Sequence, residues 1–242
     1  AFGIWFEPEM ISPDSELYRK HPDWAIQIQG REATECRQQY VLDLSRPEVR
    51  DYAYECMASI LRSANIVYVK WDMNRQLCDL GSSYLDKEHQ QELYHRYVLG
   101  VYEMQERLVQ EFPNLLLENC SGGGARFDPG MLYYSPRSGA PTTPMLSSGW
   151  RFRKERLSFI RCPLMGAHVS DCPNHTVGRV TPFETRGHVA LAGTFGYELD
   201  VTRIPGGRPE DDSGPGWKCT INITIWYGRA TIIASLPIGR II

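Results

Sequence analysis

The 242-residue chain lacks several features that would place it in a specialised class of protein. No apolar run approaches the roughly 18 residues that a membrane span needs, and its seven cysteines include no C-x-x-C pair. The formal net charge is only −3, so the basic excess of a nucleic-acid-binding protein is missing as well. These absences argue against a membrane protein, a disulfide framework, a zinc site of paired cysteines and a nucleic-acid partner.

What is present is the composition of a globular α/β domain, with 42% hydrophobic and 23% charged residues. The odd number of cysteines favours a reducing compartment, which predicts a cytoplasmic location. The chain opens at Ala1 directly on strand-like sequence, without an initiator Met. We therefore interpret it as a fragment of a longer protein.

Short apolar runs alternate with amphipathic stretches over the first two-thirds of the chain. The sequence predicts a helix over about 88–112 and another that starts at a capping box, Ser45-Arg46-Pro47-Glu48. Strands that alternate with helices pair in parallel through crossovers. The fold class is therefore α/β, and both a (β/α)₈ barrel and a doubly wound sheet fit this alternation. The predicted strands lie at 2–6, 41–45, 66–69 and 115–117.

Polar residues gather where these strands end, which is where a (β/α)₈ barrel carries its active site. Lys70 and Asp72 are two residues apart on an extended strand, so both side chains point to the same side. A nearby ammonium group would keep the carboxylate ionised, as a nucleophile requires. A structural salt bridge at a strand end explains the same pair.

Two further clusters suit the binding of a sugar. Cys120–Gly124 contains three glycines after a strand, which let backbone N–H groups approach a ligand closely. An ordinary tight turn fits this segment equally well. Trp5 stands beside Glu7 and Glu9, a combination that suits the apolar face and the hydroxyl edge of a carbohydrate. A core position is the commoner explanation of a single tryptophan.

A last cluster holds residue types that ligate zinc or iron, but their spacing fits no metal motif. We treat metal binding there as the weaker interpretation. The residues are His168, Asp171, Cys172 and His175. Tyr197–Asp200 is predicted to be one more strand end with acidic residues.

Taken together, these segments resemble glycoside hydrolase family 36, the α-galactosidases. The resemblance implies a (β/α)₈ catalytic barrel over residues 1–204, incomplete at its N-terminus. It also implies retaining hydrolysis of terminal α-D-galactosides such as melibiose- and raffinose-type sugars. The matching stretches are FGIWFEPEMISPD (2–14), 21–24, VLDLSRPEVR (41–50), KWDMNR (70–75), ENCSGGG (118–124), MGAHVS (165–170) and 195–200.

The resemblance also assigns roles to individual residues. Asp72 matches the catalytic nucleophile, and no metal or organic cofactor is implied. The implied partner is a small oligosaccharide substrate, and the intact parent is expected to be a homo-oligomer. Two alternatives stay open: galactosyl transfer of the raffinose or stachyose synthase type, and a non-catalytic galactoside-binding relic. The positions that match the galactose-binding subsite are Trp5, Arg37, Lys70, Asn74, Cys120 and Gly123.

One part of the family pattern is missing. A retaining glycosidase needs a second carboxyl group about 5–5.5 Å from the nucleophile. The family carries it as the first Asp of a W-x-S-D-D-T-D segment, whereas this chain reads Ser138–Pro144 there and has Thr142 at the acid/base position. A hydroxyl group cannot act as the acid at neutral pH. We therefore predict that the chain as written is inactive or nearly so.

The genetic code offers a cause for this gap. Suppose that the codons of residues 138–161 are read in a shifted frame, in which the third base of each codon joins the first two bases of the next. The translations that this frame permits include a string that contains D-D-T-D. The same shift over 218–236 permits a second family-like string. We hypothesise that residues 137–162 and 205–242 are frameshifted translation. Clean sequencing of the source DNA through both junctions, without an insertion or deletion, would contradict this hypothesis.

Overall fold

The structure is a computed structural model, and it describes residues 2–122, 125–139, 165–174, 178–190, 194–200 and 232–235. Its strands are β1 (Phe2–Phe6), β2 (Met10–Ile11), β3 (Tyr40–Val41), β4 (Ile66–Asp72), β5 (Leu116–Cys120), β6 (Arg137–Gly139), β7 (Met165–Ser170), β8 (Thr194–Glu198) and β9 (Ile232–Ser235). Its helices are α1 (Glu16–Lys20), α2 (Pro47–Ser63), α3 (Leu93–Glu111), α4 (Pro129–Tyr134) and α6 (Phe183–Ala190), with 3₁₀ turns η1 (Pro22–Trp24) and η2 (Gln90–Glu92).

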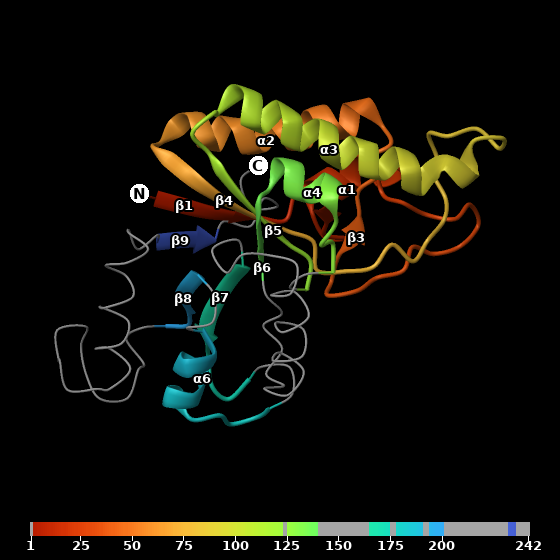
Figure 1. The fold of residues 1–242 in the computed structure, drawn as a ribbon. Coiled ribbons are helices and arrows are strands. Elements are labelled where there is room, and N and C mark those ends of the chain that lie inside the picture. The colour runs from red at the N-terminus through yellow and green to blue at the C-terminus, as the bar shows by residue number, and fades with distance from the viewer. Residues whose placement is uncertain are drawn as a thin grey trace.

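The main sheet is wholly parallel, in the order β8-β7-β6-β5-β4-β1-β9. Figure 1 shows α2 and α3 lying side by side over β4 and β5, and α6 packs beside β7. The predicted α/β class is therefore confirmed. The described strands do not show a closed eight-stranded barrel.

An ion pair between two distant strands shows that this sheet is strongly curved. Lys70 Nζ on β4 lies 3.6 Å from Glu198 Oε1 on β8. The two strands are four positions apart, which corresponds to about 19 Å across a flat sheet. The sheet curls enough for these side chains to meet across its concave face.

The core forms because α2 and α3 each present one apolar face to β4. In α2, Val49, Ala53 and Met57 recur at intervals of four residues and are buried. Val69 and Trp71 of β4 are fully buried beneath the helices. This packing fixes the carboxyl end of β4, and Asp72 with it.

Two local predictions are wrong. The run 41–45 forms no strand of the main sheet, because only Tyr40–Val41 pairs, antiparallel, with β2. The capping box at Ser45 does not form, because α2 begins one residue later, and the Ser45 hydroxyl is held by Asp43, to whose Oδ1 it donates at 2.6 Å. Arg46 is the N-cap residue of α2 and makes no side-chain capping bond.

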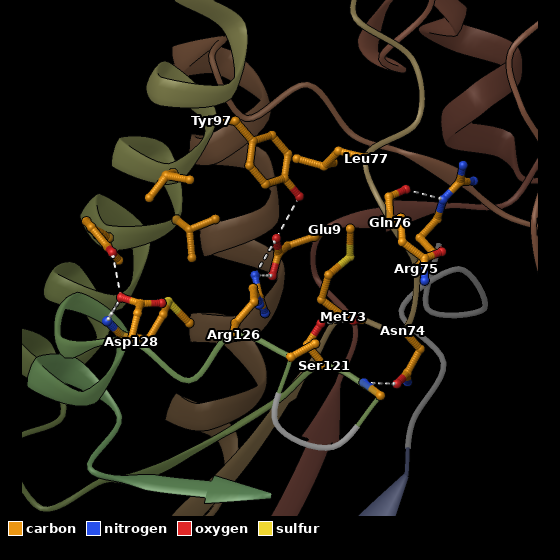
Figure 2. A pocket seen from close by; sticks show the side chains of 16 residues that line it. Glu9, Met73, Asn74, Arg75, Gln76, Leu77, Tyr97, Ser121, Arg126 and Asp128 are labelled. Atoms are coloured by element: carbon orange, nitrogen blue, oxygen red, sulfur yellow. Dashed lines mark hydrogen bonds and ion pairs between the residues drawn. The ribbon is translucent and has the colours of Figure 1, made fainter. Parts of the chain in front are cut away.

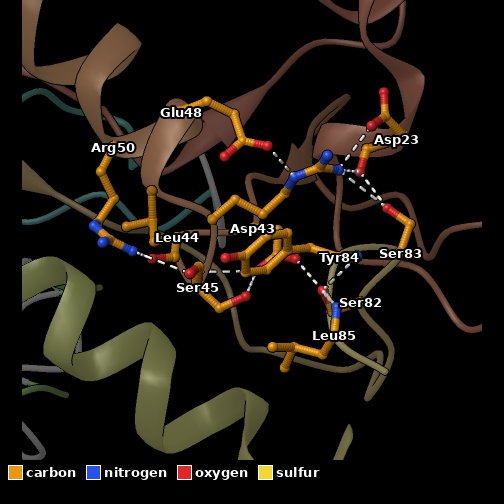
Figure 3. Close-up of polar contacts among 11 residues, drawn as sticks. Asp23, Asp43, Leu44, Ser45, Glu48, Arg50, Ser82, Ser83, Tyr84 and Leu85 are labelled. Atoms are coloured by element: carbon orange, nitrogen blue, oxygen red, sulfur yellow. Dashed lines mark hydrogen bonds and ion pairs between the residues drawn. The ribbon is translucent and has the colours of Figure 1, made fainter. Parts of the chain in front are cut away.

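Asp43 instead anchors the segment between β4 and α3 (Figure 3). Its fully buried carboxylate accepts hydrogen bonds from the backbone N–H of Ser45 at 3.0 Å and from the Ser82 hydroxyl. Gly81, in the same segment, packs directly against the backbone of Gln27. A Cβ atom at Gly81 would lie 2.4 Å from the Gln27 carbonyl oxygen. These contacts hold the segment that begins with Asn74 in place.

The domain boundaries and the frameshift hypothesis stay predictions. Most of 137–162 and 205–242 lies outside the described residues; β6 and β9 are the exceptions.

Candidate active site

Asp72 occupies the carboxyl end of β4 and is 6% exposed. Its Oδ2 accepts hydrogen bonds from Trp5 Nε1 at 3.1 Å and from Asn74 Nδ2 at 2.6 Å. Its Oδ1 accepts one from the Met73 backbone N–H at 3.1 Å. All three partners are donors, so the carboxylate acts only as an acceptor, which suits an anionic nucleophile.

Asn74 connects Asp72 to a second carboxylate. Its Nδ2 also donates to Glu7 Oε1 at 2.8 Å, and its Oδ1 accepts from the Gly122 backbone N–H at 3.0 Å. Gln39 Nε2 donates to the other Glu7 oxygen at 3.2 Å. The glycine turn, the end of β1 and the end of β4 therefore meet at one amide group.

Lys70 lies below Asp72 on β4 and is 9% exposed. Within the described part of the chain, Lys70 forms its ion pair with Glu198. The alternative explanation of Lys70 and Asp72, a structural salt bridge between them, is therefore not supported. Burial opposes the charge on Lys70, but Glu198, Cys120, Glu118 and Asp72 together raise the Lys70 pKa above its ordinary value. The ammonium group therefore stays charged beside the nucleophile.

Glu198 is bound from two sides, since His168 Nε2 also contacts its Oε2. Burial favours the neutral form of this carboxyl, but His168 and Lys70 outweigh that effect and lower the Glu198 pKa to about 2. A carboxyl group with so low a pKa carries no proton to give at neutral pH, so Glu198 cannot serve as the general acid.

The low pKa of Glu198 predicts a pH dependence of stability. Because the folded-state pKa lies below the ordinary 4.5, the ionised carboxylate stabilises the fold above about pH 4.5, and this contribution is lost as the pH falls toward 2. The difference in unfolding free energy between wild type and Glu198→Gln should therefore be largest near neutral pH and shrink between pH 4.5 and 2. Chemical denaturation at several pH values measures it. Glu184→Gln, an exposed position on α6, should show no such trend.

The other predicted binding residues fall into three groups. Cys120 is 6% exposed and pairs in register with Asp72 across the β4–β5 ladder. Arg37 lies at the exposed tip of a turn, and it forms no hydrogen bond or ion pair with any described residue. Gly123 lies outside the described residues. The structure thus brings Trp5, Lys70, Asn74 and Cys120 around Asp72, and their roles in binding galactose stay predictions.

Glu9 does not face a sugar site, contrary to the sequence interpretation. It is fully buried and accepts hydrogen bonds from Trp71 Nε1 at 2.7 Å and from the Tyr97 hydroxyl at 2.6 Å. Arg126 Nη1 contacts both Glu9 oxygens, at 2.7 and 2.9 Å. Burial, together with the Glu9 charge, raises the Tyr97 pKa well above its ordinary value.

A cavity of about 530 Å³ lies beside this buried ion pair (Figure 2). It is enclosed by α3, the start of α4 and the segments that follow β4 and β5. Asn74, Ser121 and Gly122 line both this cavity and the neighbourhood of Asp72, but Asp72 itself is not part of the wall. Asn74, Ser121 and Gly122 therefore form the part of the wall that is nearest to Asp72.

The metal interpretation gains no support from the described residues, among which no three His, Cys, Asp or Glu side chains are grouped to hold a metal ion. His168 is bound to Glu198, and Asp171 accepts from the Cys172 backbone N–H at 2.8 Å. His175 lies outside the described residues. None of the helices described is both long and apolar enough to cross a membrane.

Fold and site together describe a parallel α/β domain with a buried carboxylate, Asp72, at the carboxyl end of a strand. Comparison with known proteins gives the family: the Melibiase family model matches residues 1–211, and the chain belongs to this family. The resemblance to family 36 α-galactosidases is thereby confirmed.

Two curated relatives illustrate the similarity. α-Galactosidase AgaA of Geobacillus stearothermophilus is 51% identical over 203 residues, which cover 84% of this chain and 28% of AgaA. α-Galactosidase Mel36A of Lactobacillus acidophilus is 48% identical over 203 residues, with the same coverage of 84% and 28%. The chain thus spans less than a third of the length of these relatives.

Solved structures of α-galactosidases are similar to this chain as well. The GH36 α-galactosidase AgaB from Geobacillus stearothermophilus superposes with a TM-score of 0.80 at 46% identity, over 93% of this chain and 30% of AgaB. The A355E D548N variant of AgaA, solved in complex with raffinose, gives the same TM-score of 0.80 and 46% identity, over the same shares of the two chains.

Proposed function

We propose that this chain carries the nucleophile of a retaining α-galactosidase that releases terminal α-D-galactose from melibiose- and raffinose-type sugars. The observation that carries the proposal is Asp72, buried at a strand end and held by Trp5, Asn74 and the Met73 N–H. Relatives solved with raffinose and with stachyose support the substrate class. The strong curvature of the parallel sheet supports a (β/α)₈ barrel, incomplete at its N-terminus.

In the first step, a carboxylate oxygen of Asp72 attacks the anomeric carbon and forms a galactosyl ester. The bond from that carbon to the leaving oxygen breaks, and the leaving oxygen takes up a proton. Asn74 and Trp5 hold the Asp72 carboxylate in place by hydrogen bonds to its Oδ2. In the second step, water attacks the ester and releases galactose with its configuration retained.

We infer that the described residues around Asp72 supply no proton donor for the first step. Glu198 is ionised at neutral pH, as its pKa shows. Both Glu7 oxygens accept hydrogen bonds, from the amides of Asn74 and Gln39, so Glu7 is engaged in holding Asn74. Thr142, at the expected acid/base position, lies outside the described residues. We infer that only substrates whose leaving group needs no proton will react at a useful rate.

A leaving-group comparison tests this proposal. The chain should release dinitrophenolate from 2,4-dinitrophenyl α-galactoside but should cleave raffinose more slowly by a factor on the order of 10²–10⁴, the usual contribution of a general acid. Azide, which needs no general base, should accelerate turnover and yield α-galactosyl azide. Efficient cleavage of raffinose would show that an acid is present. Absence of a galactosyl ester on Asp72, examined by mass spectrometry of the stopped reaction, would refute the mechanism.

The cytoplasmic location and the homo-oligomeric parent stay predictions from the sequence.

A further inference from the structure

A short turn beside the site is held in a strained conformation. Cys36 and Gln39 exchange two backbone hydrogen bonds, of 3.2 and 3.1 Å, around Arg37 and Gln38. Both central residues have positive φ angles, 56° and 60°, which side chains other than glycine adopt at a cost. A strained turn of this kind persists only where the surrounding structure holds it.

Arg75 holds this turn in place. Its guanidinium donates from Nη1 to the Gln39 carbonyl at 2.5 Å and from Nη2 to the Thr34 carbonyl at 2.8 Å. The side chain is only 7% exposed, although Arg75 comes directly after Asn74 at the mouth of the site. One planar group thus binds both sides of the segment 34–39, and a lysine ammonium cannot reproduce this fork.

A second connection ties the same segment to the nucleophile. The Gln39 side chain donates to Glu7, which accepts from Asn74, which in turn donates to Asp72. Because Asn74 and Arg75 are consecutive residues, the two connections close a ring between the end of β4 and the segment 34–39. The place of Arg37 relative to Asp72 is therefore set at two points.

We propose that Arg75 is a positioning residue for galactose binding. It holds segment 34–39 so that Arg37 reaches a sugar seated at Asp72, and it does not touch the sugar itself. This inference rests on the proposed function, since the ligand is the galactosyl group. This role explains why Arg75 is buried beside the site and is bound only to backbone carbonyl oxygens.

The first test is ligand affinity in the 242-residue chain. The probe is 1-deoxygalactonojirimycin, and its Kd is measured by titration calorimetry. Arg75→Lys keeps the charge but loses the fork, so we expect Kd to rise about tenfold. The rate of dinitrophenolate release at saturating dinitrophenyl galactoside should stay within about twofold, because Asp72 is untouched. Arg31→Lys, the same substitution at an exposed position nearby, should leave both values unchanged.

A double variant shows whether Arg75 acts through Arg37. Arg37→Ala should itself raise Kd, and adding Arg75→Lys should raise it no further, since the residue being positioned is gone. If the two effects instead multiply in full, or if Arg75→Lys binds like wild type, the proposal is overturned. Should Arg75→Lys fail to fold, Arg75→Gln, which reaches one carbonyl at most, replaces it.

Hydrogen exchange gives a readout that needs no ligand. The peptide that spans 34–39 should exchange faster in Arg75→Lys than in wild type or Arg31→Lys, and equal exchange would overturn the proposal. If wild type binds the iminosugar but forms no ester, the proposed mechanism fails while the positioning role stands. If the ester forms and neither Kd nor exchange responds to Arg75→Lys, the positioning role fails alone.

Discussion

Asp72→Asn should abolish release of dinitrophenolate from the activated galactoside, by a factor on the order of 10⁴. An amide oxygen is too weak a nucleophile to form the galactosyl ester. The variant should still fold, since the amide keeps the size of the carboxylate and its oxygen can accept from Trp5 and Asn74, so that only the Met73 N–H loses its acceptor. Initial rates and mass spectrometry of the stopped reaction measure the loss.

The anomer formed with azide sharpens this test. In Asp72→Ala the space that the carboxylate occupied is open, so azide should attack from that side and give β-galactosyl azide, the opposite anomer from wild type. Asp51→Asn, an exposed position on α2 away from the site, serves as the control and should react like wild type. Retention of full turnover in Asp72→Asn would remove Asp72 from the mechanism.

Glu9→Gln should destabilise the fold by roughly 3–5 kcal/mol, the usual result of breaking a buried ion pair from one side. Glu9 is fully buried, and its removal leaves the Arg126 guanidinium charge uncompensated. The amide that replaces it also offers one acceptor oxygen where two now serve Trp71, Tyr97 and Arg126. Urea unfolding of the two proteins measures the difference.

Two further variants separate charge from packing. Glu9→Gln combined with Arg126→Met should recover part of the loss, because the unpaired charge is then gone. Glu16→Gln, at an exposed pair with Lys20 on α1, should change stability little. A loss in Glu9→Gln no larger than that in Glu16→Gln would show that the buried pair contributes little.

The placement of Asp72 and its nearest neighbours could be predicted because it depends on local sequence. A β-branched run places Asp72 at a strand end, and parallel pairing brings Trp5 and Cys120 to the same edge. The carboxyl ends of adjacent parallel strands meet whatever the rest of the fold does. This part of the site needed no knowledge of distant contacts.

The parts that could not be predicted depend on contacts between distant segments. In sequence, Glu9 is grouped with Trp5 as a sugar-binding carboxylate, and only contacts with distant residues such as Arg126, 117 positions away, explain its burial. Ser45 has the sequence of a helix cap, yet Asp43 competes for its hydroxyl. Arg75 shows no sequence signal for its role, since its partners are backbone carbonyl oxygens of residues 34 and 39.

The hydrogen bond from the Trp5 indole to Asp72 has an optical consequence. When the carboxylate becomes an ester its full negative charge disappears, and the electric field across the indole ring changes at the same moment. Trp5 emission should therefore shift as the intermediate accumulates, and the shift should reverse when azide discharges it. Under the proposed mechanism, Trp5 is therefore a built-in fluorophore for the covalent step.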